Sequence, residues 1–340
     1  MLPVKDILKI LTDVVFLPGQ EASVMNLVSS LIPNSFFCSC DEDHNIIIKS
    51  RNYDKGGLLI EAHYDTVGLI ITERVSDTNL YKCKRYGLTA PWDWRNQLVN
   101  VHLQNGKTAQ GLLLSPPPHF FINKKYEDYH SPLVVSVENS PGDVHSGDLV
   151  TYQNRSFFLE NKIIVSPYLD NNSSISAIIT LLNHLSIAEQ AKVAICLSAK
   201  EEISQSSFKY VMGNTRPSAV LSLDTCFSSD MYGIPSELNR ESKVGNGLML
   251  LDDDRMSSSL FNKMVCICKN ETIDYHLYYH PWMEKKGTNA YSIANNYPGL
   301  PVGSVLLPCS AMHTPLEMMS LQDIEQEEHL LYSFIVSMKL

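Results

Sequence analysis

Leu-Leu-Ile-Glu-Ala-His-Tyr-Asp, at residues 58–65, is a short apolar run that stops abruptly at His63 and Asp65. Runs of this length are typical of strands buried inside a sheet. Three later apolar runs also end in residues able to bind a cation: 193–202, 219–224 and 302–313. Because helical patterns alternate with these runs, we predict an α/β fold.

The residues at the ends of these runs form a set that could bind metal ions. Ligands of open α/β sheets collect beyond the carboxyl ends of the strands, so distant residues are expected to meet there. The set contains two histidines and three carboxylates. They are His63, Asp224, His313, one of the adjacent Glu201 and Glu202, and Asp170, which follows the run at 163–169 and directly precedes a predicted helix. The set suits Zn²⁺, Co²⁺ or Mn²⁺ and exceeds what one catalytic zinc takes from protein. We therefore predict two divalent ions that share a bridging carboxylate.

Each of these residues has an ordinary explanation when it is taken alone. An acid at the end of a strand most often caps a helix or lies in a solvated turn, and a single histidine is most often a hydrogen-bonded core residue. Glu201 and Glu202 could be the solvated start of a helix. Their joint occurrence favours a metal site, and two adjacent glutamates allow one to bind metal while the other acts as a base.

Apolar spacing locates the main helices and strands. Helical spacing at 4–11 and 24–31 opens the chain, and strand-like runs follow at 45–48 and 58–62. The closing helix should begin near Ser320. These elements predict a mixed sheet covered by helices on both faces, an α/β/α arrangement.

The middle of the chain has a different character. Between about residues 66 and 163 there are short strand-like runs and turn-rich stretches without a convincing amphipathic helix. We therefore predict a small all-β domain inserted at 66–163. The main α/β domain would consist of residues 1–65 and 164–340.

Composition and charge disfavour several other classes of protein. The formal net charge of −10 argues against a nucleic-acid partner, because nucleic-acid binders present a basic face. The N-terminal segment lacks the pattern of a signal peptide, and no stretch approaches the roughly 20 apolar residues of a membrane helix. Eight scattered cysteines, several inside apolar runs, indicate reduced thiols. We expect a cytoplasmic protein with no membrane partner.

Beyond these patterns, the sequence resembles a family of dinuclear metallo-aminopeptidases that includes glutamyl and deblocking aminopeptidases and the tetrahedral (TET) self-compartmentalising enzymes. The matching segments occur in the order that the family has: HYDTVGLII (63–71), SPPPHFF (115–121), SGDLVTY (146–152), YLDNNSS (168–174), AKEEIS (199–204), LSLDTC (221–226), GTNAYSI (287–293) and PCSAMHTPLEM (308–318). Each segment is short, but the ordered set covers nearly the whole chain and is specific.

The resemblance implies how the metal ligands divide between two ions. His63 and Asp224 would hold one ion, and Glu202 and His313 would hold the other. Asp170 would bridge the two. Zn²⁺ is the expected ion, with Co²⁺ or Mn²⁺ as alternatives.

The resemblance also implies an activity and an assembly. Glu201 would be the general base that takes a proton from a water activated by two metals and delivers it to the leaving amine. Asp65 would orient His63. The predicted function is an aminopeptidase that hydrolyses the N-terminal peptide bond of small peptides. The inserted domain would be PDZ-like or barrel-like and would drive homo-oligomerisation, from a dimer up to a dodecamer.

The sequence departs from the family at four polar positions: Asn171, Asn172, Asn289 and Ser310. The family commonly has aspartate at the first and third of these positions and arginine at the second and fourth. We hypothesise that these acids and arginines form charge pairs that were lost as units, since removing one partner of a buried pair is costly. The changes leave the predicted ligands and base intact, but they bear on substrate preference and rate.

Two other functions stay open on the sequence. A related two-metal deacylase or carboxypeptidase would use the same water activation but would recognise a carboxylate, so it would favour arginine or lysine near the pocket. A catalytically impaired paralogue would keep the site for assembly or regulation, and the four polar departures support it. A degenerate site has little reason to keep Glu201 beside Glu202.

Overall fold

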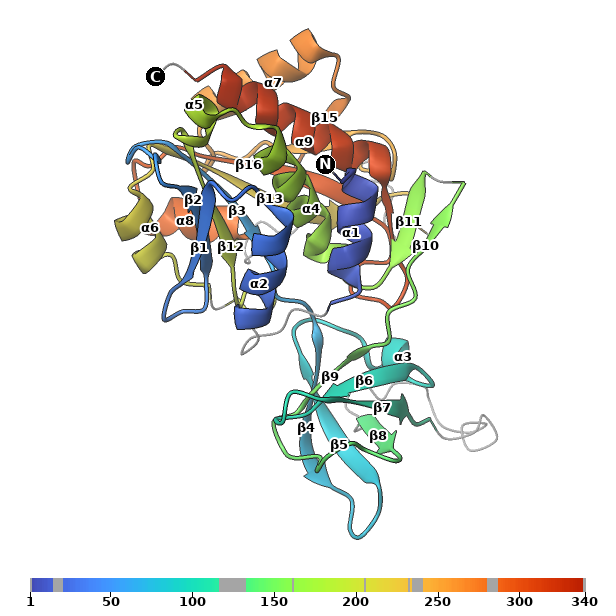
Figure 1. Cartoon of the computed structure of the whole chain (residues 1–340). Coiled ribbons are helices and arrows are strands. Elements are labelled where there is room, and N and C mark those ends of the chain that lie inside the picture. Colours follow the sequence, from blue (N-terminus) through green and yellow to red (C-terminus); the bar gives the residue numbers. More distant parts are fainter. Residues whose placement is uncertain are drawn as a thin grey trace.

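The computed structural model describes residues 2–14, 21–115, 133–160, 162–204, 206–231, 233, 241–279 and 287–338. Its main body is built on one eight-stranded mixed sheet (Figure 1). In spatial order the strands are β1 (Phe36–Cys40), β2 (Ile46–Ser50), β12 (Val193–Ser198), β3 (Leu58–His63), β13 (Ala219–Phe227), β16 (Val302–Cys309), β14 (Leu248–Leu251) and β15 (Tyr275–Tyr278).

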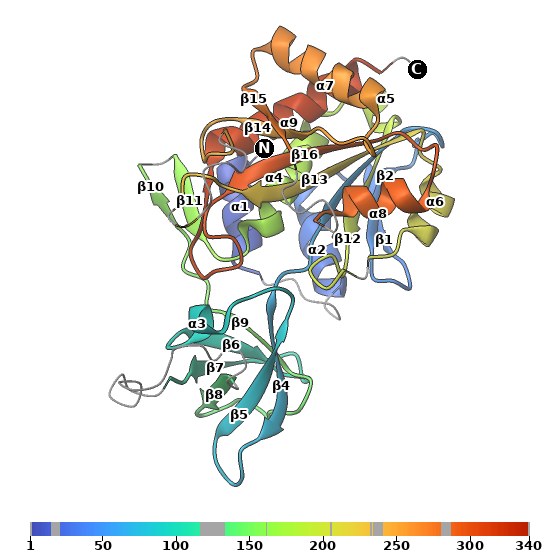
Figure 2. The ribbon, with the colours of Figure 1, turned by 180° about the vertical axis from the view of Figure 1, so that it is seen from behind.

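Helices cover both faces of this sheet, as Figures 1 and 2 show from opposite sides. One face packs against α1 (Val4–Thr12), α2 (Glu21–Leu31), α4 (Leu169–His184), α7 (Ser258–Glu271) and α9 (Leu321–Val336). The other face packs against α6 (Lys209–Thr215) and α8 (Asn289–Asn296), and the short α5 (Ile187–Gln190) precedes β12. Alternate residues of β3 illustrate the two cores, since Leu58 and Ile60 pack on the first side and Leu59 on the second.

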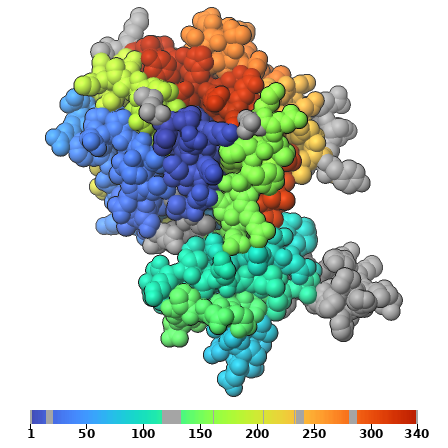
Figure 3. All heavy atoms as spheres, turned by 45° about the vertical axis from the view of Figure 1, so that its right-hand side comes forward, coloured from blue at the N-terminus to red at the C-terminus, as the bar shows by residue number. Residues whose placement is uncertain are grey.

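A six-stranded closed barrel forms a separate lobe beside the main body (Figure 3). Its antiparallel strands, in order around the barrel, are β4 (Gly68–Arg74), β5 (Leu80–Tyr86), β8 (Leu133–Val137), β7 (Thr108–Leu113), β6 (Leu98–His102) and β9 (Leu149–Tyr152). The barrel has its own core, in which Trp94 of α3 (Pro91–Trp94) stacks on Tyr152 with ring centres 3.8 Å apart.

A three-stranded sheet joins the chain leaving the barrel to the main body. It contains β10 (Phe157–Leu159), β11 (Ile163–Ser166) and β17 (Glu317–Ser320), all antiparallel. Among the described residues, no helix is both long and apolar enough to cross a membrane. All eight cysteines are unpaired, as the sequence predicts.

The structure confirms the predicted mixed α/β sheet with helices on both faces and a small β-barrel. The helices at 4–11 and 24–31 are α1 and α2, and Ser320 caps α9 by accepting a hydrogen bond from the Asp323 amide at 3.3 Å. Residues 116–121 of the proline-rich motif lie outside the described residues. The domain limits at 66 and 163 stay a prediction.

Glu327 of α9 is a fully buried acid beneath the sheet. Its Oε1 accepts a hydrogen bond from Ser174 at 3.3 Å, while Oε2 has no hydrogen-bond partner among the described residues. Burial raises the pKa of Glu327 from 4.5 to about 8. The folded chain therefore keeps a proton that the unfolded chain releases, and stability falls as the pH rises from about 4.5 to about 8.

Replacing Glu327 by glutamine should remove this pH dependence. We expect Glu327→Gln to change the free energy of unfolding little near pH 5. Near pH 8.5 the variant should be more stable than the wild type by a few kcal/mol, which is the order of magnitude that the raised pKa of Glu327 implies. Urea unfolding followed by circular dichroism at several pH values would measure the difference. Glu325→Gln, at an exposed position of the same helix, is the control. If both variants show the same pH dependence, the account of Glu327 is wrong.

Candidate metal centre

Four parallel strands bring the predicted site residues to one edge of the sheet. β12, β3, β13 and β16 are contiguous, and each runs parallel to its neighbour in this group. His63 ends β3, Glu201 and Glu202 follow β12, Asp224 lies near the end of β13, and His313 follows β16. The convergence expected from the sequence is therefore present, because the carboxyl ends of these strands meet at the same edge.

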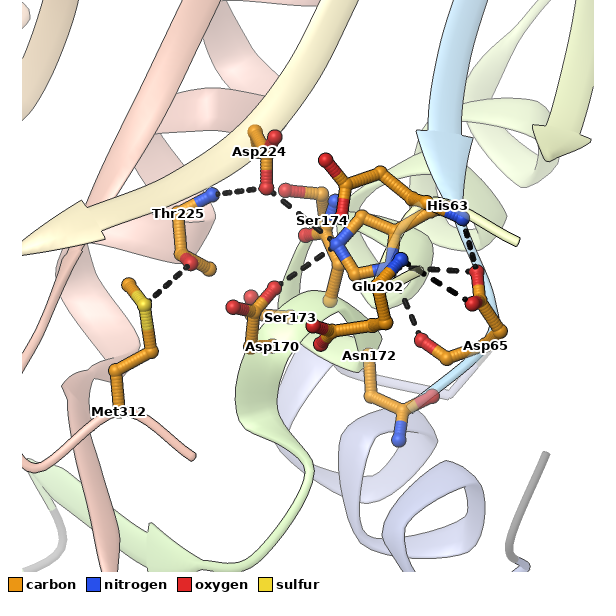
Figure 4. Close-up of polar contacts among 12 residues, drawn as sticks. His63, Asp65, Asp170, Asn172, Ser173, Ser174, Glu202, Asp224, Thr225 and Met312 are labelled. Carbon is orange, nitrogen blue, oxygen red and sulfur yellow. Dashed lines mark hydrogen bonds and ion pairs between the residues drawn. The ribbon is translucent and has the colours of Figure 1, made fainter. Parts of the chain in front are cut away.

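Asp170, at the start of α4, is close to both histidines, and Figure 4 shows its contact with His63. Its Oδ1 is 3.0 Å from His63 Nε2, and its Oδ2 is 3.4 Å from His313 Nε2. Asp224 Oδ1 is 3.4 Å from His63 Nε2, and Glu202 Oε1 is 3.2 Å from His313 Nε2. The carboxylate of Asp170 thus joins two groups of ligand atoms, one around each imidazole.

Both imidazoles are held in the orientation that metal binding requires. His63 Nδ1 is 3.0 Å from the backbone oxygen of Asp65, and His313 Nδ1 is 2.6 Å from the backbone oxygen of Leu88. A carbonyl oxygen can only accept, so each Nδ1 must carry a proton and donate it. Among the described residues, each Nε2 then faces carboxylate oxygens, an arrangement that suits either a proton on Nε2 or a metal ion between nitrogen and oxygen.

The spacing of these atoms fits divalent metal ions. Two ligand atoms bound tetrahedrally to one zinc, at bond lengths near 2.1 Å, lie roughly 3.4 Å apart. His63, Asp170 and Glu202 each offer a ligand atom, and these atoms lie within 4.8 Å of one another. Glu202 Oε1 is buried and accepts no hydrogen bond from the described residues. The residues present therefore suit metal ions of the kind that the sequence predicts.

The charges of the site are strongly coupled. Burial disfavours ionised Asp170, but hydrogen bonds from His313 and His63 outweigh it and hold the Asp170 pKa below the ordinary range. Burial, together with the negative charges of Asp224 and Glu202, raises the pKa of Glu201 well above its usual value. So many buried carboxylates repel one another, and bound cations would relieve that repulsion.

Asp65 fixes the turn that carries both glutamates. Its carboxylate accepts hydrogen bonds from the amides of Glu201 and Glu202, at 3.0 and 3.3 Å. Its Oδ1 is 3.9 Å from His63 Nδ1, farther than its own backbone oxygen. In this structure the carboxylate of Asp65 therefore contacts the turn after β12 most closely, while the backbone of Asp65 holds the His63 ring.

Glu317 holds the backbone near Asp170 and His313, as Asp65 holds the turn that carries Glu201 and Glu202. The sequence did not predict this role. Glu317 Oε2 accepts from the amides of Leu169 and Asp170, at 2.7 and 3.1 Å, and its Oε1 accepts from the His313 amide at 2.7 Å. Burial raises the Glu317 pKa to about 8. The only signal in the sequence is its position four residues after His313, inside a matching motif.

The four polar departures lie in three different settings. The side-chain amides of Asn171 and Asn172 donate to the backbone oxygens of Leu223 and Tyr168, at 2.9 and 2.8 Å. Ser310 pairs through its backbone with Met318. Within the described part of the chain, none of the four side chains forms a hydrogen bond with another of the four. The charge-pair hypothesis for the family stays a hypothesis.

Asn289 has a specific partner in this chain. Its Nδ2 donates to Oε1 of Glu61 at 2.8 Å, and Glu61 also accepts from Ser198 and Ser222. Burial raises the pKa of Glu61. An aspartate at 289 would set a second carboxylate against Glu61, so asparagine suits this environment.

A mixed α/β body that gathers two histidines and several carboxylates at one sheet edge is suited to metal-dependent hydrolysis. Residues 44–330 match the family model for the M42 glutamyl aminopeptidases. The chain therefore belongs to the M42 glutamyl aminopeptidase family, whose members are metal-dependent peptidases.

Solved structures of similar fold cover nearly the whole chain. An aminopeptidase of the archaeon Desulfurococcus kamchatkensis matches with a TM-score of 0.85 at 22% identity, over 99% of this chain and 95% of that one. A TET aminopeptidase of a marine-sediment Thaumarchaeota archaeon gives 0.85 at 18% identity, over 99% and 97%. A TET peptidase of Pyrococcus horikoshii gives 0.81 at 19%, over 99% and 100%. These likenesses show the shared fold.

The contacts of Asp65 predict a measurable effect on metal affinity. In Asp65→Asn, the side chain keeps one acceptor oxygen, so one of the two amide hydrogen bonds that fix the turn is lost. We expect the affinity for Zn²⁺ to fall about 10- to 100-fold, measured by competition with a chromogenic chelator. Asp77→Asn, at an exposed position of the barrel, should match the wild type. Unchanged zinc affinity in folded Asp65→Asn would show that this carboxylate does not support the site.

Proposed function

We propose that this chain is a two-metal aminopeptidase in which Glu201 is the general base. The observation that carries the proposal is the position of Asp170, whose two oxygens face two separate imidazoles. His63 and Asp224 would complete one ion's ligands, and Glu202 and His313 the other's. The ions, when bound, would supply Lewis acidity that lowers the pKa of a water and polarises a carbonyl group. Zn²⁺ is the proposed ion, and Co²⁺ or Mn²⁺ would fit the same donors.

The residues of the chain would divide the remaining work. Glu201 takes a proton from the attacking water and delivers it to the leaving amine nitrogen. Burial and neighbouring carboxylates raise the pKa of Glu201. A raised pKa lets this carboxyl group hold the proton after it leaves the water and before it reaches the amine. Asp65 holds Glu201 in place through the amide hydrogen bond at 3.0 Å.

The lining of the site supports recognition of an amine over a carboxylate. The cavity at the metal ligands also contains Glu201, and its described lining residues include no lysine or arginine. Glu201, which is not a proposed ligand, would attract a protonated N-terminus even when the ions offset the charge of the ligands, whereas a free carboxylate would find no described cationic side chain to pair with. This favours an aminopeptidase acting on small peptides over the carboxypeptidase or deacylase alternative.

Two glutamine variants should separate the base from the ligand. Glu201→Gln should lower kcat for a leucyl-p-nitroanilide about 10²- to 10⁴-fold while zinc content stays at the wild-type level. Glu202→Gln should lower both activity and zinc content, because it removes a ligand. Initial rates and elemental analysis of the desalted proteins would measure both quantities. Full activity in Glu201→Gln would exclude Glu201 as the base. If the wild type hydrolyses neither free-amine nor N-acetylated substrates in a metal-dependent manner, the proposed peptidase activity is refuted.

We also propose that the chain assembles into homo-oligomers through the barrel. The similar TET peptidase of Pyrococcus horikoshii can assemble into a tetrahedron or a large octahedral shell. On the barrel here, three exposed leucines form a leucine patch: Leu98, Leu112 and Leu114. Leu98 and Leu112 are cross-strand partners on β6 and β7. Neighbouring exposed apolar side chains of this kind suit a protein interface.

Charges placed in the leucine patch should disrupt the assembly. We expect the double variant Leu98→Asp/Leu112→Asp to lower the mass measured by light scattering, toward the 38.2 kDa of one chain. Ile187→Asp, at an exposed apolar position of α5 in the main body, should leave the mass unchanged. A wild-type protein that is already monomeric would contradict the proposed oligomer. An unchanged mass in the double variant would exclude the leucine patch as the interface.

A further inference from the structure

Two cavities of similar size open beside the metal ligands and meet at Glu201. The first, of about 410 Å³, contains the ligands Asp170, Glu202, Asp224 and His313. The second, of about 430 Å³, contains none of these ligands. Both are lined by Glu201, Ser204 and Thr288, so the proposed base lies on their boundary.

The cavity at the ligands has an apolar wall. Besides the ionisable ligands, it is lined by Phe227 at the end of β13, Tyr278 of β15, Leu306 of β16 and Met312 beside His313. Leu88 from the barrel closes another side. We name this part the apolar pocket. An apolar side chain would be favoured there, whereas a substrate carboxylate would be desolvated against the apolar wall without a described lysine or arginine to pair with it.

The second cavity is polar. Its wall carries hydroxyl and amide side chains from α8 and from the turn after β12: Ser204, Ser206, Asn289, Ser292, Asn295 and Asn296. We name it the polar pocket. These groups both donate and accept hydrogen bonds, so they suit a side chain with an amide or a hydroxyl group.

Arg255 is the one cation among the described residues that line the polar pocket. Its Nε and Nη2 donate to the two oxygens of Asp253, each at 2.8 Å, and its guanidinium lies 3.7 Å from the centre of the Tyr291 ring. Asp253 therefore offsets the charge of Arg255. The polar pocket is consequently suited to neutral polar groups more than to a carboxylate.

The role of Glu201 fixes the direction of a bound peptide. A base that protonates the leaving nitrogen must lie against that nitrogen, so the chain beyond the scissile bond must begin next to Glu201. The free N-terminus and the first residue lie on the other side of the scissile bond, in the cavity that contains the metal ligands. The first residue then lies in the apolar pocket, and the second residue extends into the polar pocket.

We propose that the enzyme removes large apolar residues from peptides whose second residue is polar and uncharged. This specificity rests on the proposed aminopeptidase function and gives it a substrate class. A preference for glutamate, which the name of the family suggests, is therefore not the one that these described residues favour.

Two series of substrates test the two pockets on the zinc-loaded wild type. Among aminoacyl-p-nitroanilides, kcat/KM for leucine, methionine or phenylalanine should exceed that for glutamate about 100-fold. Among leucyl dipeptide amides, which lack a free C-terminal carboxylate, Leu-Asn and Leu-Ser should exceed Leu-Leu and Leu-Phe about fivefold. Equal rates across either series, or a preference for glutamate in first place, would overturn the proposal.

Two variants with matched controls test whether the apolar pocket sets the preference for the first residue and the polar pocket sets the preference for the second. Phe227→Lys should lower the ratio of leucyl to glutamyl hydrolysis about tenfold, because it removes apolar contact and adds a positive charge. Phe157→Lys, at a similarly exposed phenylalanine of β10, should leave the ratio unchanged. Asn295→Leu on α8 should reverse the preference for a polar second residue, and Asn270→Leu on α7 should not.

The outcomes distinguish failure of the specificity from failure of the function. If the wild type hydrolyses free-amine substrates in a metal-dependent manner but the Phe227 and Asn295 variants keep wild-type ratios, the pocket assignment is wrong and the aminopeptidase function stands. If no substrate of either series is hydrolysed by the zinc-loaded protein, both proposals fail together. Thermal melts of each variant, compared with the wild type, show that a changed ratio comes from a folded protein.

Discussion

The mutual repulsion of buried carboxylates is the constraint on which the rest of the structure depends. Glu201, Glu202 and Asp224 meet at one sheet edge because parallel strands end there, and the start of α4 brings Asp170 beside them. Two imidazoles present Nε2 to these acids with Nδ1 already donating to backbone oxygens, as Figure 4 shows for His63. Such an arrangement is costly without cations, and metal ions would complete the site.

The inserted barrel contributes to the candidate metal site as well as being a candidate interface. The backbone oxygen of Leu88, in the segment after β5, holds the ring of His313, and the Leu88 side chain lines the apolar pocket. Any displacement of the barrel would therefore change both the orientation of a ligand and the shape of the cavity. The proposed assembly through the barrel and the proposed chemistry at the sheet edge would thus be linked through one short segment.

The sequence predicts the strands of this site well because each is a buried parallel strand that appears as an apolar run with a polar end. It could not predict Glu61 or Glu317, because an acid inside an apolar segment gives no indication of the serines or amides that satisfy it. The Leu88 contact was equally invisible, since a backbone oxygen has no sequence signal. Tertiary packing alone decides such contacts. For the same reason the sequence could show that Asn289 differs from the family, but not that it faces Glu61.

The number of metal ions bound per chain tests the central claim most directly. The protein would be loaded with Zn²⁺, desalted to remove weakly held metal, and measured by elemental analysis against protein concentration. We expect two ions per chain in the wild type and fewer in Asp170→Asn, because Asp170 is the one acid among the described residues that faces both imidazoles. One ion per chain in the wild type, or two in Asp170→Asn, would contradict the bridged two-metal site.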